Sequence, residues 1–186
     1  MKKFFLAALV TACAFGASAQ TFWNSEAPEK KVTFGIRAGL NIASVTDKPE
    51  GVKSRTSFHA GVSADWNIIN SFSINSGLFY TGKGVKDFKA DFLEIPVYVS
   101  YRINFAEQSQ LQVNFGPYFD YGIAGDAFKD DMGGKRFQMG LGVGAAYTFH
   151  KFLLGFQYQF GMTKALDIED SKNKWTNMAI TLGYNF

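Results

Sequence analysis

Hydrophobic and polar side chains alternate with a period of two along most of the chain. In the first such segment Val32, Phe34 and Ile36 share one face, whereas the positions between them carry small polar residues, glycine and one arginine. This period is typical of β-strands, because successive side chains point to opposite faces of a sheet. The pattern predicts eight strands, at 32–42, 57–68, 72–81, 93–105, 111–123, 137–149, 152–163 and 175–186. Most are as long as, or longer than, the roughly 9 to 11 residues with which a tilted strand crosses a bilayer.

The polar faces distinguish a membrane barrel from a soluble sandwich or a soluble ligand-binding barrel. A strand face in water normally carries many Lys and Glu, whereas these faces carry Gly, Ser, Thr, Asn and Gln with isolated charges. The opposite faces are rich in rings and too extensive to be exposed to water. A closed sheet also satisfies every backbone N–H and C=O group in hydrocarbon. The sequence therefore predicts an all-β fold, an eight-stranded antiparallel up-and-down transmembrane β-barrel over residues 32–186.

The connections between the strands predict the orientation of this barrel. Short connections at 70–71, 106–110 and 150–151 alternate with longer, more charged ones at 46–55, 84–91, 125–135 and 164–174. Outer-membrane barrels have short periplasmic turns and longer external loops. Aromatic residues also gather near both ends of the strands, where rings prefer the headgroup region. We expect the barrel to start and finish on the periplasmic side, at Val32 and Phe186.

Residues 1–19 show the three parts of a secretory signal peptide. Two lysines precede an apolar stretch, and the small residues at 17–19 suit the signal peptidase. Cleavage after Ala19 removes both lysines and lowers the formal net charge from +3 to +1. No cluster of Lys or Arg then supports nucleic-acid binding. Residues 20–31 lack a period and are expected to form a periplasmic N-terminal tail.

The composition of the chain argues against a disordered protein and against a disulfide-linked one. With 47% hydrophobic and 19% charged residues, the chain is not typical of a disordered protein. Its single cysteine, Cys13, excludes an internal disulfide framework. Cys13 follows a short stretch that resembles a lipoprotein cleavage box, which would make it a lipidated N-terminus. The shortness of the preceding apolar stretch favours cleavage after Ala19 instead.

Four motifs, in this order, resemble the small outer-membrane β-barrel family of Gram-negative bacteria. They lie at 34–41, 92–97, 116–121 and 182–186, and within this OmpA-like, eight-stranded group they are most similar to the PorT-like branch. The resemblance implies the barrel fold and a location in the cell outer membrane. The family is functionally mixed, so no secretion role is inferred. The last motif, with Tyr184 and Phe186, also looks like the insertion signal recognised by the outer-membrane assembly machinery.

The interior of an eight-stranded barrel is just wide enough for side chains, so its charges should be paired. The hairpin register brings Arg37 near Asp65, and the same reasoning places Lys83 near Glu94. The charges assigned to structural pairs in the lumen are Arg37, Asp65, Lys83, Glu94, Arg102 and Asp120. Large inward side chains, namely Phe79, Tyr98, Tyr118 and Trp175, argue against a general diffusion pore.

Two prolines interrupt the predicted ladder. Pro96 and Pro117 lie on neighbouring strands of a sheet without a free edge, and each lacks the N–H group that a ladder uses. We expect a β-bulge or a bound water there.

Candidate catalytic chemistry is sparse. Only His59 and His150 could serve as neutral bases, and His59 is about 20 Å along its strand from Asp65 at 3.3 Å per residue. The sequence therefore predicts no catalytic residue, no cofactor and no metal site. Two acidic loop groups could hold calcium or bridge lipopolysaccharide, although solvated charge is the simpler interpretation; they are Asp126, Asp130 and Asp131, and Asp167, Glu169 and Asp170.

Three functional hypotheses are compatible with these features. The first is a non-enzymatic, monomeric outer-membrane barrel with a structural, adhesion or partner-docking role exercised through external loops. Its expected partners are outer-membrane lipid, lipopolysaccharide and the assembly machinery. The second is a narrow pore or small-ligand transporter, for which conductance is diagnostic. The third is a lipid-modifying barrel enzyme, which should lose activity on His59→Ala.

Overall fold

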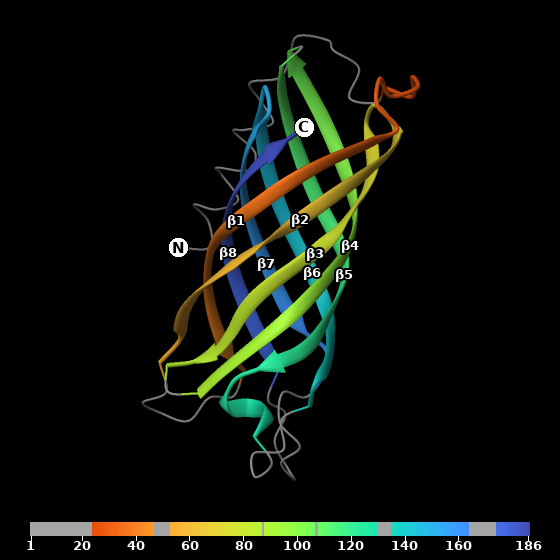
Figure 1. Ribbon diagram of the computed structural model, residues 1–186. Coiled ribbons are helices and arrows are strands. Elements are labelled where there is room, and N and C mark those ends of the chain that lie inside the picture. The colour runs from red at the N-terminus through yellow and green to blue at the C-terminus, as the bar shows by residue number, and fades with distance from the viewer. Residues whose placement is uncertain (1–23, 47–52, 87, 107, 130–134, 164–173) are drawn as a thin grey trace, which may run out of the picture.

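A computed structural model describes residues 24–46, 53–86, 88–106, 108–129, 135–163 and 174–186. Within them, eight antiparallel strands close into a barrel in which sequence neighbours pair and the first strand pairs with the last (Figure 1). The strands are β1 (Val32–Val45), β2 (Arg55–Ile69), β3 (Phe72–Val85), β4 (Phe88–Ala106), β5 (Ser109–Ala124), β6 (Phe137–Phe149), β7 (Phe152–Gly161) and β8 (Trp175–Asn185), and one 3-10 turn, η1 (Asp126–Phe128), follows β5. The predicted fold is confirmed.

The two ends of the barrel differ in the length of their connections. The short-turn end is where β2 joins β3, β4 joins β5 and β6 joins β7, and the loop end is the opposite end. β1 begins and β8 finishes at the short-turn end, uppermost in Figure 1. No helix in the described part of the chain has the length and hydropathy of a membrane-spanning helix.

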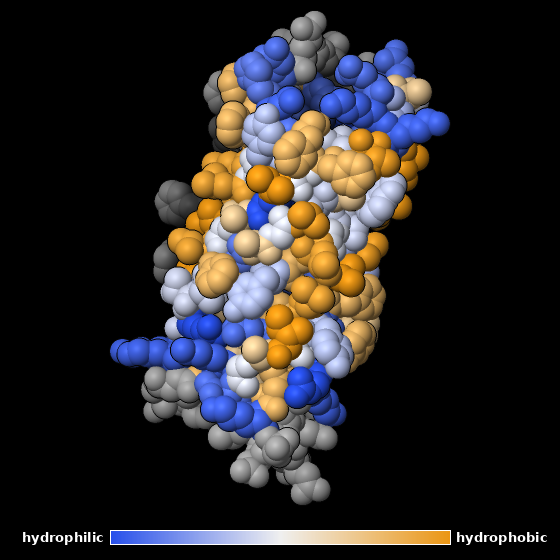
Figure 2. All heavy atoms as spheres, viewed as in Figure 1, coloured by the Kyte–Doolittle hydropathy of each residue, from blue (hydrophilic) through white to orange (hydrophobic). Residues whose placement is uncertain are grey.

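The outer surface of the barrel is apolar. Phe34 is 61% exposed, Val97 38% and Ile180 54%, and Leu141 is half-buried rather than part of a common interior. On the face seen in Figure 2, hydrophobic side chains form a broad band between two hydrophilic ends. The alternation in the sequence therefore turns its apolar face outward, as predicted.

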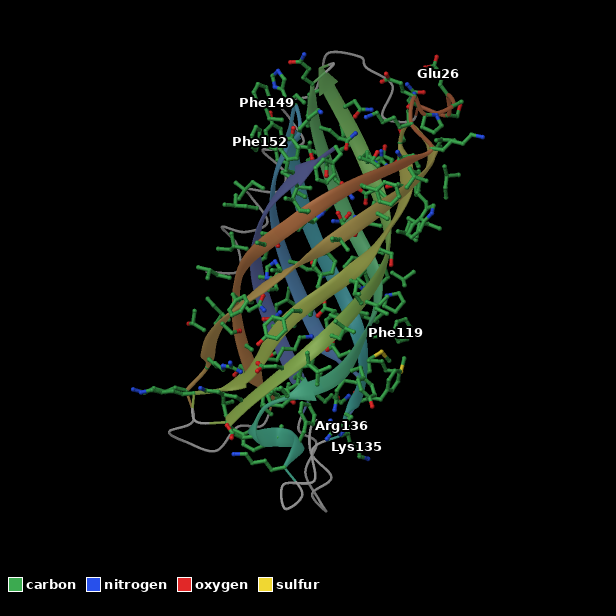
Figure 3. The ribbon with its side chains drawn as sticks, in the orientation of Figure 1. Glu26, Phe119, Lys135, Arg136, Phe149 and Phe152 are labelled. Atoms are coloured by element: carbon green, nitrogen blue, oxygen red, sulfur yellow. The ribbon has the colours of Figure 1, made fainter. Side chains whose placement is uncertain are left out.

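Aromatic side chains project from both ends of this apolar band. Exposed aromatic residues at the short-turn end are Trp66, Phe105, Tyr147, Phe149, Phe152 and Phe186, and those nearer the loop end are Phe58, Tyr121, Phe137 and Phe160. In Figure 3, Phe149 and Phe152 extend away from the strands near one end, and Phe119 lies nearer the other. This distribution matches the preference of amphipathic rings for the two headgroup regions.

Glycine is required where interior side chains approach the sheet. Gly39 of β1 pairs with His59 in β2 and with Thr181 in β8. A Cβ atom on Gly39 would lie 1.9 Å from the Ile180 carbonyl oxygen and 2.6 Å from the His59 ring. Only a residue without a side chain fits between these two strands at this position.

The predicted loop at 84–91 is wrong, because the β3 and β4 ladder continues almost to its turn. Val85 pairs with Phe88, and Gly82 pairs with Asp91. Ala90 and Phe92 point inward and are fully buried. The charges between these apolar residues concealed the alternation, while Gly84, at φ 123°, adopts a conformation that other residues rarely take.

Of the β-bulge or bound water expected at the two prolines, the bulge is wrong, and the water stays a prediction. Pro96 pairs with Tyr118, and the β4–β5 register is the same on both sides of a gap of two residue pairs. The register shifts of this hairpin lie instead at Asp91/Phe92 and Asn104/Ala106. Gly116, next to Pro117, lets β5 approach β4 closely, because a Cβ atom on residue 116 would lie 2.3 Å from the Val97 carbonyl oxygen. The ladder thus loses bonds locally without gaining a residue.

An apolar cluster fills the interior at the loop end. It consists of Ala90, Phe92, Ala127 and Trp175, with Val45, Phe88 and Phe128 packed against it. Ala127 and Phe128 belong to η1, which forms inside the predicted loop 125–135. The Phe92 and Phe128 rings meet edge to face with centroids 5.4 Å apart. The 3-10 turn η1 therefore covers the loop end of the barrel with hydrophobic side chains.

At the short-turn end, the segment 24–31 is bonded to the barrel. Asn24 N donates to Ser71 Oγ at 2.8 Å, and Ser71 N donates to the Asn24 carbonyl oxygen at 3.2 Å. Lys30 Nζ donates to the Phe186 carbonyl oxygen at 3.2 Å. The described part of the predicted tail is thus attached to the β2–β3 turn.

The apolar exterior predicts a position-dependent cost for a charge. Val62 lies mid-strand and is 57% exposed, whereas Ile68 lies near the end of the same strand and is 59% exposed. We expect Val62→Arg to reduce the free energy of unfolding in lipid vesicles by about 2–4 kcal/mol, and the matched Ile68→Arg by about 0–1 kcal/mol. Equal costs in reversible denaturant unfolding would contradict the placement of Val62 near the bilayer midplane.

Candidate functional site

A buried cluster of charges lies within the barrel toward the loop end. Lys83 Nζ is 2.6 Å from Asp120 Oδ2 and 3.0 Å from Glu94 Oε2. Lys83 is fully buried, Asp120 is 2% exposed and Glu94 is 6% exposed. The Lys83 ammonium also lies 4.4 Å from the centroid of the Tyr118 ring. Three strands, β3, β4 and β5, thus each contribute one charge to a single compact cluster.

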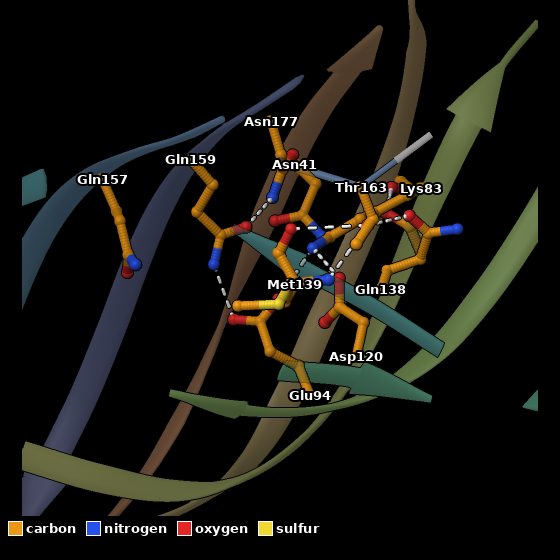
Figure 4. A network of polar contacts seen from close by, with 12 residues as sticks. Asn41, Lys83, Glu94, Asp120, Gln138, Met139, Gln157, Gln159, Thr163 and Asn177 are labelled. Carbon is orange, nitrogen blue, oxygen red and sulfur yellow. Dashed lines mark hydrogen bonds and ion pairs between the residues drawn. The ribbon is translucent and has the colours of Figure 1, made fainter. Parts of the chain in front are cut away.

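Neutral side chains connect this cluster to the centre of the lumen (Figure 4). Gln159 Nε2 donates to Glu94 Oε1 at 2.6 Å and lies 3.2 Å from the Tyr98 hydroxyl, which also accepts a bond from Gln157. Asn177 Nδ2 donates to Gln159 Oε1 at 3.1 Å. The network therefore extends from β3 around to β8 and satisfies polar groups that the lumen would otherwise leave without partners.

A second ion pair lies closer to the short-turn end. The Arg37 guanidinium is 3.2 Å from Asp65 Oδ2, and Arg37 Nε donates to Ser63 Oγ at 2.8 Å. Asn75 donates to the other oxygen of Asp65. Arg37 is paired with Gly61 in the sheet. The Arg37 side chain therefore extends diagonally across the sheet to Asp65 rather than to the residue directly opposite.

Arg102 bonds to neutral side chains rather than to one of these acids. Its Nε donates to Ser73 Oγ at 3.0 Å, and its Nη2 donates to Asn67 Oδ1. Within the described residues, no carboxylate lies within ion-pair distance of Arg102. A further pair not foreseen in the sequence joins Arg55 to Asp91 at 3.4 Å. The prediction of an acid partner for Arg102 is therefore not met among these residues.

His59 is positioned by two hydrogen bonds that the sequence did not suggest. Its Nδ1 is 2.8 Å from Asn41 Oδ1, and its Nε2 is 3.0 Å from Thr181 Oγ1. Asn41 Nδ2 donates to the Gly82 carbonyl oxygen at 3.2 Å, which orients its amide so that Oδ1 faces the histidine. In neutral His59, Nδ1 then carries the proton and Nε2 accepts from Thr181. The order hydroxyl, imidazole, amide resembles a nucleophile, a base and an orienting group.

The space beside His59 is small. The central cavity has a volume of about 60 Å³ and is lined by Asn41, His59, Glu94 and Thr181, among others. Such a volume accommodates a few water molecules at about 10–15 Å³ each. The Asn41–His59–Thr181 group is therefore next to water-sized space rather than a lipid-sized cleft. Recognising this group from sequence would have required the register of both strands that flank Gly39.

The remaining predicted residues are at the barrel ends. Asp126 Oδ1 accepts from Lys129 Nζ at 2.7 Å, and this contact lowers the pKa of the Asp126 carboxyl group below its ordinary value. The other acidic residues of the two loop groups lie outside the described residues. His150 adopts φ 55° in the β6–β7 turn. No group of three His, Cys, Asp or Glu side chains in the described part of the chain is arranged to hold a metal ion.

The sequence of the chain is similar to that of a known protein family. The model of the outer membrane protein beta-barrel domain matches residues 5–186. The chain belongs to this family. It is an outer-membrane protein, as its eight-stranded fold and its apolar exterior indicated. No curated protein sequence matches the chain.

The chain is also similar to solved structures of small outer-membrane proteins. Neisserial surface protein A is 13% identical, with a TM-score of 0.62 over 84% of this chain and 98% of that protein. OprG from Pseudomonas aeruginosa is 12% identical, with a TM-score of 0.48 over 88% and 99%. Ail, the attachment invasion locus protein of Yersinia pestis, is 17% identical, with a TM-score of 0.46 over 84% and 100%. At these identities the likeness concerns the fold. The resemblance to the PorT-like branch stays a prediction.

Tyr184 and Phe186 lie where an insertion signal is expected. The two rings meet with centroids 5.6 Å apart, and Tyr184 also contacts Phe152 at 5.4 Å. Phe186 N donates to the Phe34 carbonyl oxygen at 2.9 Å, which extends the β1–β8 pairing by one residue. Recognition of these residues by the assembly machinery stays a prediction.

The buried cluster predicts a large effect of removing its cation. Lys83→Met leaves Glu94 and Asp120 buried without compensation, so we expect a loss of about 3–5 kcal/mol in the free energy of unfolding. The triple variant Lys83→Met, Glu94→Gln, Asp120→Asn removes all three charges and should recover most of that loss. Denaturant unfolding in vesicles measures both. A single variant as stable as the wild type would contradict the role assigned to Lys83.

Proposed function

We propose that this protein is a non-enzymatic outer-membrane barrel whose loop end docks anionic partners, with lipopolysaccharide as the first of them. The observation that carries the proposal is the filled lumen. Hydrophobic side chains around Phe92 and Trp175 occupy its loop end, and the Lys83 cluster lies deeper inside the barrel. Because the central cavity of the described lumen has a volume of only about 60 Å³, a large partner would contact the barrel at its ends.

The charge of the loop end supports this choice of partner. Exposed basic side chains in its described part are Lys53, Lys86, Lys89, Lys129, Lys135 and Arg136. The acids described there are fewer, and Asp91 and Asp126 are each paired with a cation. Figure 3 shows Lys135 and Arg136 beyond the strand ends on this side. Ammonium and guanidinium groups are the usual protein ligands of phosphate.

The alternative of a lipid-modifying enzyme has one supporting feature, the Asn41–His59–Thr181 group. Access argues against it, because a substrate acyl chain would have to enter a cavity of about 60 Å³ inside the barrel. His59 is also buried, at 7% exposed. We therefore assign these three residues to packing of the lumen across the β1–β8 seam.

The docking proposal predicts charge-dependent stabilisation by lipopolysaccharide. In vesicles that contain lipopolysaccharide, the thermal unfolding midpoint should exceed that in vesicles with the dephosphorylated form. Lys86→Gln, Lys89→Gln and Lys135→Gln together should remove at least half of this difference, because they remove three exposed positive charges. The matched control Lys30→Gln, Lys31→Gln and Lys151→Gln, which removes three exposed positive charges at the opposite end, should keep it. Equal midpoints for the wild type in both vesicles would contradict the proposal.

The pore alternative predicts a different result in the same preparation. If the lumen is closed as its packing suggests, the wild-type protein in planar bilayers should give no current steps above those of a protein-free bilayer. A porin inserted into the same bilayers serves as the positive control. Reproducible unit currents from the wild type would favour the narrow-pore hypothesis over the docking barrel.

A further inference from the structure

A polar cavity of about 740 Å³ opens at the short-turn end of the barrel, and we call it the vestibule. Its volume is within the range of about 300–1,000 Å³ that is typical of small-molecule sites. The lining includes eight Asn and Gln side chains, and its apolar members are Pro28 and Phe186. The Arg37–Asp65 pair separates it from the central cavity, since Asp65 lines the vestibule and Arg37 lines the central cavity. The vestibule is therefore a separate, hydrophilic site.

Arg102 gives this site a fixed positive charge. It lines the vestibule, and its bonds to Ser73 and Asn67 orient the guanidinium without neutralising it. Asp65 also lines the vestibule, but its two oxygens bond to Arg37 and Asn75. A guanidinium held by neutral acceptors keeps its charge for an anion, and its planar array of donors suits a carboxylate.

Two lysines add positive charge to the same lining. Lys30 and Lys151 line the vestibule, and Glu29 is the remaining acid besides Asp65. Lys30 Nζ donates to the main-chain oxygen of Phe186, and Lys151 Nζ lies 5.8 Å from the centroid of the Tyr184 ring. The described lining thus carries the cationic side chains of Arg102, Lys30 and Lys151 and the acidic side chains of Glu29 and Asp65.

The neutral part of the lining suits hydroxyl groups. A carboxamide presents both donors and an acceptor, which is the complement of a sugar hydroxyl. Asn104 and Gln112 line the cavity from β4 and β5, and Asn67 lies beside them with its own amide bonded to Arg102, to Thr33 and to the Lys30 carbonyl oxygen. A polyhydroxylated ligand would therefore meet carboxamides on several sides of the cavity.

We propose that the vestibule binds an anionic saccharide, with Arg102 holding its carboxylate and the carboxamides holding its hydroxyl groups. Phe186 lines the same cavity, and its main-chain oxygen accepts a bond from Lys30 Nζ there. On the orientation expected from the connections, this end faces the periplasm. The site is at the opposite end from the proposed lipopolysaccharide contact, so the two proposals can fail independently.

Titration calorimetry of the full chain in detergent tests this proposal with two matched probes. Hyaluronan tetrasaccharide carries carboxylates, whereas chitotetraose is a neutral amino-sugar chain of the same length. We expect the hyaluronan tetrasaccharide to bind at least tenfold more tightly than chitotetraose. Arg102→Gln should weaken that binding at least tenfold, and Arg102→Lys should weaken it less. Lys129→Gln, the same charge change on an exposed side chain at the loop end, should leave it unchanged.

Every result of these titrations either supports or contradicts saccharide binding in the vestibule. Heat-modifiable gel migration and circular dichroism show whether Arg102→Gln folds like the wild type. If it does not, Lys30→Gln takes its place, and we expect that variant to bind the hyaluronan tetrasaccharide at least threefold more weakly. Failure of both saccharides to bind, equal binding of both, or equal effects of Arg102→Gln and Lys129→Gln would overturn the proposal. Inorganic phosphate binding as tightly as the tetrasaccharide would assign the charge of the vestibule to a small anion instead.

Discussion

Closure of the sheet between β1 and β8 is the constraint on which the other features depend. An open edge in hydrocarbon would leave a row of N–H and C=O groups without partners, each at a cost of several kcal/mol. The seam runs from Gly35↔Asn185 to Val45↔Trp175. Gly39 lies within it because its neighbour's carbonyl oxygen leaves no room for a Cβ atom. His59 then reaches over Gly39 to Thr181, so that a side-chain bond from β2 to β8 spans the seam.

Closure also determines what the interior contains. A small barrel has little volume to fill, and its side chains must satisfy one another because bulk water is excluded. The Lys83 cluster, the Gln159 network and the Arg37–Asp65 pair are successive polar layers along that interior. Among the described residues they border a small central cavity and, at the short-turn end, the larger vestibule. The same packing that stabilises the barrel therefore restricts binding to its two ends.

The two ends differ in chemistry. At the loop end, hydrophobic side chains of η1 and Trp175 cover the lumen, and exposed basic residues surround them. At the short-turn end the lumen widens into a cavity lined by carboxamides, with the segment 24–31 bonded beside it. The proposed roles follow this difference: a charged outer rim suits a large anionic surface, and a polar cavity suits a small hydrophilic ligand.

The amino-acid sequence alone determined the strands, their lipid-facing sides and the outer-membrane family, because alternation and composition are local properties. It also placed Arg37 near Asp65 and Lys83 near Glu94, since hairpin neighbours are close in sequence. Tertiary structure decided the rest. Asp120 joins Lys83 from β5, Thr181 meets His59 across the seam, and Arg102 lies beside neutral acceptors. These contacts depend on closure, strand tilt and the diagonal reach of long side chains, which no local pattern specifies.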